Sequence, residues 1–489
     1  MLLRTLLVAL LLAAPAWASA WAQTSTAQDC TVDGTLAQSD GLKLDIVYRC
    51  RSAGALTFQA AGDFTVSKVL SFRDGAGVSQ PIAPGGWRVE PVNGIVEARY
   101  RYDLAAHARA VDAPSKALQR GEGVISLLSG WLLEPAGYTH FATIDIRMAT
   151  ASGLVFAAGL PRVGDAWRLA GTTVRFAGYT VLGRLDLTDL AVPLPGSLRA
   201  GAAQGQGVLR LALLDGFTAG QRGELVDWVR RTAEAESNYW QGFTARQMLL
   251  VLVPVPSRRG IAYGRTVPGG GPTVMIEVGA GIDRRGLFDD WVLVHELIHT
   301  GMAFIRGRNT WFMEGAATYA EPIIRARAGW KTEEEVWREW VTGMPQGAAA
   351  FARGLGDASG RENYWGGALF MLLADVEIRR ATSGAKGLED CLGGVLWSGL
   401  DGSQRATLDA YAAICDRATG TTAMRGLIDR YVVSARPVDL AAVWRDLGIS
   451  MVGGRIALDD TAPDARWRRM IVMGPSGQPP KRVPLPWGN

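Results

Sequence analysis

The stretch DDWVLVHELIHT, residues 289–300, determines how the rest of this sequence is interpreted. Apart from His295, Glu296 and His299, its positions from Trp291 onward are apolar almost all round, which indicates a buried helix. The two aspartates at its start can cap the first turn and complement the helix dipole. Histidines four residues apart project from one face of a helix and can hold one metal ion. Glu296 lies one step round the helix, where its carboxylate can reach a water molecule on that metal.

The alternative interpretation is a pair of core histidines whose polar atoms bond to the backbone. The chain has only four histidines, and a chance HExxH motif is expected on the order of once in a thousand such sequences. Without a metal, a buried apolar helix would hold three polar groups that have no role, which is energetically costly. The pattern therefore favours a metal site.

Two histidines and a water molecule do not complete the tetrahedral shell of a zinc ion, so a third protein ligand is needed. The stretch NTWFMEGAATYAE, residues 309–321, predicts a second helix that is capped by one of its first two residues. Pro322 is expected to kink or end this helix. Spacing alone leaves two candidates for the third ligand, Glu314 and Glu321.

An HExxH motif followed by W-x-x-E-G-x-x-x-Y resembles the gluzincin metallopeptidases, whose catalytic core is similar to that of thermolysin. Among them, the sequence is most similar to the glycyl aminopeptidase family, relatives of aminopeptidase N, over about residues 205–450. The resemblance implies one Zn²⁺ per chain, held by His295, His299 and Glu314. Of the two candidate glutamates, only Glu314 occupies the E-G position of the family. The resemblance also makes Glu296 the catalytic base.

A second match to the family is ENYWGGAL, residues 362–369, which is similar to its Y-x-x-G-A-L helix start. Residues 372–380 are similar to the L-D-x-x-I-R continuation of that helix. In the family, this tyrosine donates a hydrogen bond to the tetrahedral intermediate, so the resemblance gives that role to Tyr364. The alternative is a tyrosine that only packs at the start of a helix.

The sequence departs from the family pattern in two places. The substrate-binding loop of the family carries a Gly-Gly-x-Glu motif, whose acid anchors the free amino group of the substrate in aminopeptidases. The nearest counterpart here is GGGP, residues 269–272, and the next glutamate is Glu277. Many relatives end in a PDZ domain, for which the roughly 40 residues after Ile449 are too few.

The sequence predicts a multidomain α+β protein. Residues 23–195 alternate short strand-like segments with Gly, Pro and Asp, which indicates a β-rich N-terminal domain. A Gly- and Ala-rich linker, residues 196–206, leads to a thermolysin-like α/β catalytic domain over residues 205–330. Residues 331–450 are expected to form an α-helical domain, and the proline-rich tail, residues 451–489, is expected to be irregular.

Residues 1–22 have the pattern of a secretory signal peptide. Arg4 precedes a short apolar run, residues 6–14, and Ala20 and Ala22 mark two cleavage positions. This run cannot span the ~30 Å of membrane hydrocarbon, and no later run reaches ~18 apolar residues, so no membrane span is expected in the mature chain. The sequence therefore predicts an exported protein, either periplasmic or secreted.

Four cysteines follow the predicted signal peptide. An even number in an oxidising compartment suggests disulfide bonds, and four cysteines can pair in three ways. Local pairing, Cys30 with Cys50 and Cys391 with Cys415, is favoured because each pair lies within one apparent domain. Four free buried thiols are the alternative.

Composition and charge narrow the range of partners. The net charge is only +4 and the Lys and Arg residues are dispersed, so the chain has no electrostatic footprint for nucleic acid. The expected partner is a peptide or protein substrate, which could pair with a strand edge offered by residues 269–278. The sequence gives no indication of the oligomeric state.

The expected reaction is zinc-dependent peptide hydrolysis of the aminopeptidase type. Zinc activates a water molecule, Glu296 accepts its proton, and Tyr364 helps zinc to hold the oxyanion. Two alternatives stay open at this point. One is an endopeptidase with the same site, and the other is a non-catalytic, zinc-containing envelope protein that binds peptides.

Overall fold

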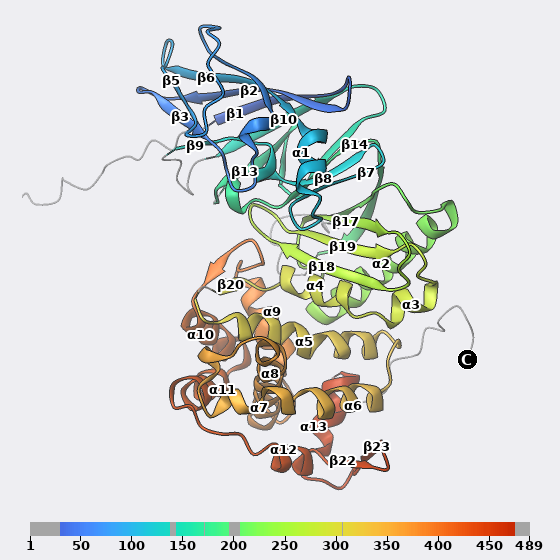
Figure 1. The fold of residues 1–489 in the computed structure, drawn as a ribbon. Helices are drawn as coiled ribbons and strands as arrows, with labels where there is room; N and C mark the ends of the chain where they lie inside the picture. Colours follow the sequence, from blue (N-terminus) through green and yellow to red (C-terminus); the bar gives the residue numbers. More distant parts are fainter. Residues whose placement is uncertain (1–29, 137–142, 171, 195–205, 306, 475–489) are drawn as a thin grey trace, which may run out of the picture.

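A computed structural model describes residues 30–136, 143–170, 172–194, 206–305 and 307–474. Figure 1 shows three stacked parts: a β-rich N-terminal part at the top, a sheet with helices in the middle, and a helical part at the bottom. The predicted multidomain α+β architecture is confirmed. The predicted signal peptide, residues 1–22, and nearly all of the predicted linker, residues 196–206, lie outside the described residues.

The N-terminal part consists of short strands and one helix. Their bounds are β1 (Cys30–Gln38), β2 (Leu42–Arg51), β3 (Leu56–Gln59), β4 (Val69–Asp74), β5 (Trp87–Val89), β6 (Ile95–Asp103), α1 (Leu104–Val111), β7 (Ala117–Arg120), β8 (Gly123–Leu127), β9 (Glu134–Pro135), β10 (Ile144–Thr150), β11 (Val155–Ala158), β12 (Arg162–Val163), β13 (Ala166–Leu169) and β14 (Tyr179–Gly183). The described strands form sheets in the orders β12-β13-β10-β1-β2-β6-β4, β11-β14-β8-β7 and β5-β3-β9.

Strand β2 shows why these segments form a sheet. Its side chains alternate between buried and half-buried positions from Leu42 to Cys50, as expected for a strand with one face on a core. The antiparallel register of β1 and β2 places Cys30 directly opposite Cys50, and the two form a disulfide bond. The predicted local pairing is therefore confirmed for this pair.

The middle part is a five-stranded sheet in the order β15-β16-β17-β19-β18. Its elements are β15 (Asp186–Pro193), β16 (Gln206–Leu213), α2 (Ala219–Trp240), β17 (Gln247–Val255), β18 (Ile261–Val267), β19 (Thr273–Gly279), α3 (Arg284–Asp289) and α4 (Val292–Thr300). Strands β16, β17 and β19 are parallel, and β15 and β18 are antiparallel to their neighbours. The central strand β17 is buried over most of its length, as expected for a parallel strand covered on both faces.

Two sequence expectations about this sheet need correction. The predicted domain boundary at residue 195 falls after β15, but β15 pairs with β16 and belongs to the middle sheet. The segment 269–278 was expected to offer a strand edge, but β19 lies between β17 and β18. The strand at the edge is β18.

The helical part follows α4 along the chain. Its elements are β20 (Phe304–Ile305), α5 (Thr310–Arg327), α6 (Glu333–Gly343), α7 (Pro345–Phe351), α8 (Arg361–Ala381), α9 (Leu388–Trp397), β21 (Arg405–Ala406), α10 (Leu408–Thr419), α11 (Ala423–Ile428), α12 (Leu440–Asp446), β22 (Ile449–Val452), β23 (Arg455–Leu458) and α13 (Ala465–Met473). Cys391 on α9 and Cys415 on α10 form a disulfide bond, which confirms the second predicted pair.

Helices α5 and α8 cross at an unusually short distance. A Cβ atom added to Gly315 on α5 would lie 2.3 Å from the Cα atom of Gly367 on α8, so only glycines permit this crossing. Pro322 lies inside α5, which continues to Arg327, so the proline does not end the helix.

The tail expected to be irregular is ordered over most of the described length. Strands β22 and β23 pair as a hairpin, and α13 packs on the helical part. Arg468 on α13 is only 1% exposed and bonds to the backbone carbonyl groups of Leu447 and Asp459. The expectation is therefore wrong for residues 451–473, and residues 475–489 lie outside the described residues.

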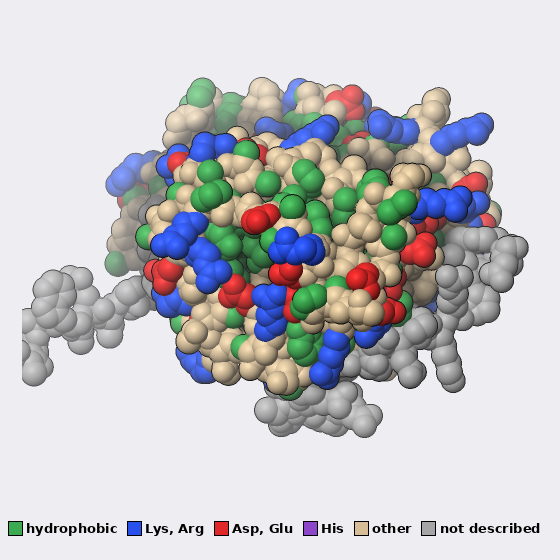
Figure 2. All heavy atoms as spheres, turned by 90° about the horizontal axis from the view of Figure 1, so that it is seen from below, with side chains coloured by type: hydrophobic (Ala, Val, Ile, Leu, Met, Phe, Trp, Pro, Cys, Tyr) green, Lys and Arg blue, Asp and Glu red, His purple; other side chains and the backbone are tan. Residues whose placement is uncertain are grey.

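The helical end of the molecule carries mixed charge. Figure 2 looks onto this end and shows Lys and Arg side chains interspersed with Asp and Glu side chains. Among the residues that the structure describes, no helix combines the length and apolarity needed to cross a bilayer.

Candidate metal centre

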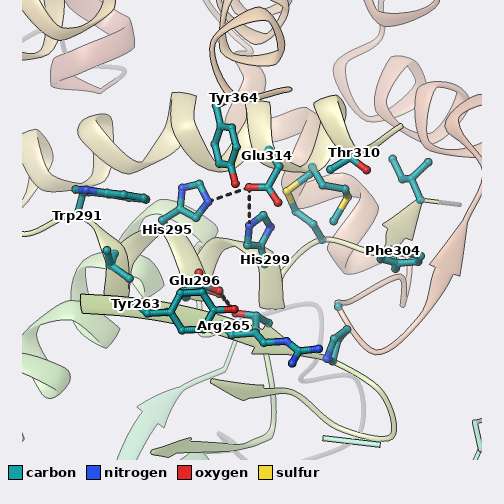
Figure 3. A pocket seen from close by; sticks show the side chains of 18 of the residues that line it. Tyr263, Arg265, Trp291, His295, Glu296, His299, Phe304, Thr310, Glu314 and Tyr364 are labelled. Atoms are coloured by element: carbon teal, nitrogen blue, oxygen red, sulfur yellow. Dashed lines mark hydrogen bonds and ion pairs between the residues drawn. The ribbon is translucent and has the colours of Figure 1, made fainter. Parts of the chain in front are cut away.

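Three metal-ligating side chains converge between the middle sheet and the helical part. His295 and His299 lie on α4, and Glu314 lies in the second turn of α5. Potential ligand atoms of the three residues all lie within 4.8 Å of one another. Oε2 of Glu314 is 3.2 Å from Nε2 of His295 and 3.6 Å from Nε2 of His299 (Figure 3).

Packing of α4 fixes the direction of the two imidazoles. Leu293, Val294, Leu297 and Ile298 are buried and hold the helix between the sheet and the helical part. The N-cap residue of α4 is Trp291, and the N–H of Val292 donates to Oδ1 of Asp290 at 2.8 Å, so one of the two predicted aspartates satisfies an N–H of the first turn. The helical spacing then places both histidines on the face turned to α5.

The three side chains shift one another's protonation. Burial opposes ionisation of Glu314, but hydrogen bonds from both imidazoles hold the pKa of its carboxyl well below the usual range. Burial lowers the pKa of His295 despite its bond to Glu314. Burial also acts against His299, but the contact with Glu314 outweighs it and raises the pKa of that imidazole.

The donor set fits a zinc ion. Two imidazole nitrogens and one carboxylate oxygen from two facing helices are the ligands of catalytic zinc sites that keep a fourth position open. There is room for that fourth position, because all three residues line a cleft of about 510 Å³. These residues would hold the ion, and the cleft would admit its water and a substrate.

Glu321, the other candidate ligand, is not part of this group. It is 3% exposed, and its carboxylate accepts a hydrogen bond of 2.7 Å from Nη1 of Arg325 one turn along α5. Burial raises the pKa of Glu321, and Arg325 partly offsets this effect. The structure therefore leaves Glu314 as the third member.

Glu296 faces the edge strand β18 and not the ligand group. Its Oε2 atom lies 2.8 Å from the hydroxyl oxygen of Thr266 on β18. A Cβ atom added to Gly264 would lie 2.8 Å from Cγ of Glu296 and 2.5 Å from Cγ1 of Val292. A glycine at this position thus lets the edge strand approach α4, and the carboxylate lies between the strand and the cleft.

Tyr364 lies in the first turn of α8 and reaches the same cleft. Its ring is 6.2 Å from the ring of His295, with 27° between their planes. Figure 3 shows its hydroxyl directed towards Glu314. Burial raises its pKa, and the charges of Glu314 and Glu296 add to this effect. The structure therefore brings together all five residues singled out in the sequence.

The sequence interpretation missed several residues that line the cleft. Three of them, Tyr263, Arg265 and Thr266, come from β18. Trp291 contacts His295 edge-on, with 5.1 Å between ring centroids. The central glycine of β18, Gly264, is a local sign of a close backbone approach, but β18 has no alternating burial pattern that could have revealed an edge strand.

The fold is similar to that of known peptidases. No family model matches the sequence, and none of the curated proteins matches it. A structure of an aminopeptidase N family protein from Idiomarina loihiensis does match, with a TM-score of 0.60 and 13% identity over 86% of this chain and 78% of that chain. The chain has the aminopeptidase N fold.

Two other solved structures show weaker similarity to the chain. An M1 zinc metallopeptidase from Deinococcus radiodurans has a TM-score of 0.48 at 16% identity, over 84% of this chain and 95% of that chain. Aminopeptidase A from Legionella pneumophila has a TM-score of 0.47 at 11% identity, over 82% of this chain and 49% of that chain. The aminopeptidase N fold confirms the architecture that the sequence resemblance implied.

Proposed function

We propose that this chain is a zinc metallopeptidase that hydrolyses peptide bonds. The observation that carries the proposal is the convergence of His295, His299 and Glu314, with Glu296 beside them, at the wall of one cleft. The aminopeptidase N fold supports it. A zinc ion bound there would lower the pKa of its water and polarise a substrate carbonyl.

Side chains that line this cleft have separate roles in proton transfer and in stabilising the oxyanion. Glu296 accepts the proton of the attacking water and then delivers it to the leaving amine. The hydroxyl of Tyr364 donates a hydrogen bond to the oxyanion as the carbonyl becomes tetrahedral. The edge strand β18 offers backbone N–H and C=O groups with which an extended peptide can pair.

The fold favours an aminopeptidase-like reaction, in which the substrate has a free amino group, as the first candidate. One observation favours a second candidate, cleavage that does not need a free amino group. The carboxylates that line the cleft among the described residues are Glu296 and Glu314, and both already have roles. Glu277 on β19 does not line the cleft. Burial raises the pKa of its carboxyl, and the charges of Arg120 and Arg258 partly offset this effect.

Metal content and a base variant test the proposal. The purified chain should hold about one zinc per chain by elemental analysis, and His295→Ala or His299→Ala should lose it. Glu296→Gln should keep the zinc and lose nearly all hydrolysis, because a carboxamide cannot accept the proton of the water. A Glu296→Gln variant with near wild-type turnover would contradict the mechanism. A zinc-loaded wild-type chain that binds peptides but never cleaves them would favour the non-catalytic alternative.

We also propose that the protein is exported. The two disulfide bonds support this proposal, since such bonds persist in oxidising compartments. Sequencing the N-terminus of the natural protein should give Trp21 or Gln23. A start at Met1 in a cytoplasmic fraction would contradict export.

A further inference from the structure

Arg265 is the one described arginine or lysine side chain that lines the cleft of the metal group. It follows Tyr263 and Gly264 on β18 and precedes Thr266, whose hydroxyl contacts Glu296. Since consecutive Cα atoms are about 3.8 Å apart, the backbone of Arg265 begins next to the proposed base. Figure 3 shows its side chain on the Glu296 side of the cleft.

The guanidinium of Arg265 is held in place but keeps most of its donors. Its Nη1 atom donates to the backbone carbonyl of Ser115, in the N-terminal part, at 2.5 Å. The hydroxyl of Tyr179 donates to the same carbonyl at 3.2 Å, which ties this wall of the cleft together. The guanidinium also forms a hydrogen bond with the side chain of Tyr179, and no carboxylate is its partner within the described part of the chain, although a guanidinium has five N–H donors.

The charges in the cleft therefore suit an anion and not an ammonium group. Both lining carboxylates, Glu296 and Glu314, are engaged in the proposed chemistry. A protonated amino group placed near Arg265 would be repelled and would find no free carboxylate. A carboxylate there would meet a planar fork of N–H donors, whose geometry matches its two oxygens.

We propose that Arg265 is a specificity-determining residue that binds a carboxylate of the peptide substrate. This inference rests on the proposed peptidase function. The carboxylate comes either from the C-terminus of the peptide or from an acidic side chain near the cleaved bond. The alternative role for Arg265 is purely structural: a tie between β18 and the N-terminal part through Ser115.

Equilibrium binding separates these roles without relying on turnover. The probes are N-acetylated pentapeptides of one sequence that end in a free carboxylate or in a carboxamide. A further set of amidated peptides carries a glutamate in place of a glutamine, at a different position in each peptide. Binding to full-length, zinc-loaded Glu296→Gln protein is measured by calorimetry. We expect at least one carboxylate form to bind about 10–100-fold more tightly than its neutral counterpart, as for one charge-assisted contact.

Variants at position 265 then assign the preference. Adding Arg265→Gln to the Glu296→Gln protein should abolish the preference and leave the affinity for the neutral peptide within about threefold. Arg265→Lys should restore part of it, because the charge remains but the fork is lost. The matched control is Arg259→Gln, which removes the same charge from an exposed position outside the cleft lining and should leave the preference intact.

The outcomes distinguish this inference from the proposed function. Equal binding of acid and amide peptides, or a preference that survives Arg265→Gln, overturns the role of Arg265. Whichever peptides bind, a zinc-loaded wild-type chain that hydrolyses none of them overturns the proposed function. The preferred carboxylate form, C-terminal or side-chain, identifies the source of the anion.

Discussion

The hydroxyl oxygen of Thr266 lies 2.7 Å from the backbone carbonyl oxygen of Glu296 and 2.8 Å from its carboxylate Oε2. A hydroxyl has one proton, so the two acceptors share it. This contact joins the edge strand β18 to the helix that carries both histidines. It fixes the carboxylate relative to the strand on which we expect the peptide to lie.

Loss of the Thr266 hydroxyl should therefore slow the chemistry. We expect Thr266→Val to lower kcat about 10–100-fold, the effect of losing a hydrogen bond to a charged group. KM and zinc content should change little, because the hydroxyl is engaged by the backbone carbonyl and the carboxylate of Glu296. Thr266→Ser keeps the hydroxyl and serves as the matched control. Steady-state kinetics decide the matter, and full activity of the valine variant would show that Glu296 needs no such positioning.

Removal of the Tyr364 hydroxyl should act on the transition state. In Tyr364→Phe, turnover should fall about 10²–10³-fold while KM stays roughly constant, as for loss of one oxyanion donor. The ring contact with His295 is kept, so fold and zinc content should be preserved. Kinetics on protein of confirmed zinc content measure this change. A turnover within about threefold of wild type would return Tyr364 to a packing role.

Glu321→Gln should damage stability and not metal binding. The substitution leaves Arg325 buried without its carboxylate partner, which costs roughly 3–5 kcal/mol in comparable buried pairs. Zinc stoichiometry should remain about one per chain, whereas Glu314→Gln should weaken zinc binding itself. Elemental analysis and thermal unfolding of both variants give the comparison. Zinc loss in Glu321→Gln with unchanged stability would reverse the ligand assignment.

The N-terminal part should become less stable as the pH falls. His107 is fully buried, its Nδ1 atom lies 3.1 Å from the hydroxyl of Thr65, and its Nε2 atom has no partner among the described residues. Burial lowers the pKa of His107 to about 4. In the unfolded chain the imidazole binds a proton near pH 6.5. The contribution of the neutral His107 to the free energy of unfolding is therefore fully present above about pH 6.5. It falls by about 3 kcal/mol as the pH drops towards 4.

A variant isolates the contribution of His107 from that of the acidic groups. His107→Gln cannot titrate, so its unfolding transition should depend less steeply on pH between about 6.5 and 4 than that of the wild type. Calorimetric scans across this range compare the two proteins. Parallel pH profiles would show that His107 titrates normally in the folded chain.

The metal group was predictable because it depends on local spacing. His295, Glu296 and His299 follow one helical period, and spacing placed the third ligand in the next helix, at Glu314 or Glu321. The choice of Glu314 came from the resemblance to the family motif. The disulfide pairs were predictable for a similar reason, since each joins neighbouring elements. Tyr364 was reached only through resemblance, because nothing in its local sequence directs the start of α8 to the cleft.

The edge strand and the ordered tail depend on contacts that local sequence does not contain. Residues 261–267 have a glycine at their centre and no apolar run, and strand order is set by pairing with β19. Helix α13 carries arginines that suggest a solvated surface. Arg468 is buried there because Asp460 and Glu333, the second of them distant in sequence, neutralise it.

The crossing of Gly315 and Gly367 has a consequence for local opening of the site. Because the two backbones touch, α5 cannot tilt without displacing the first turns of α8. The amide protons of Gly315 on α5 and of the residues that follow Tyr364 on α8 should therefore exchange as one cooperative unit. A fluctuation that released the carboxylate would also withdraw the tyrosine, so the molecule would pass between a complete site and a dismantled one.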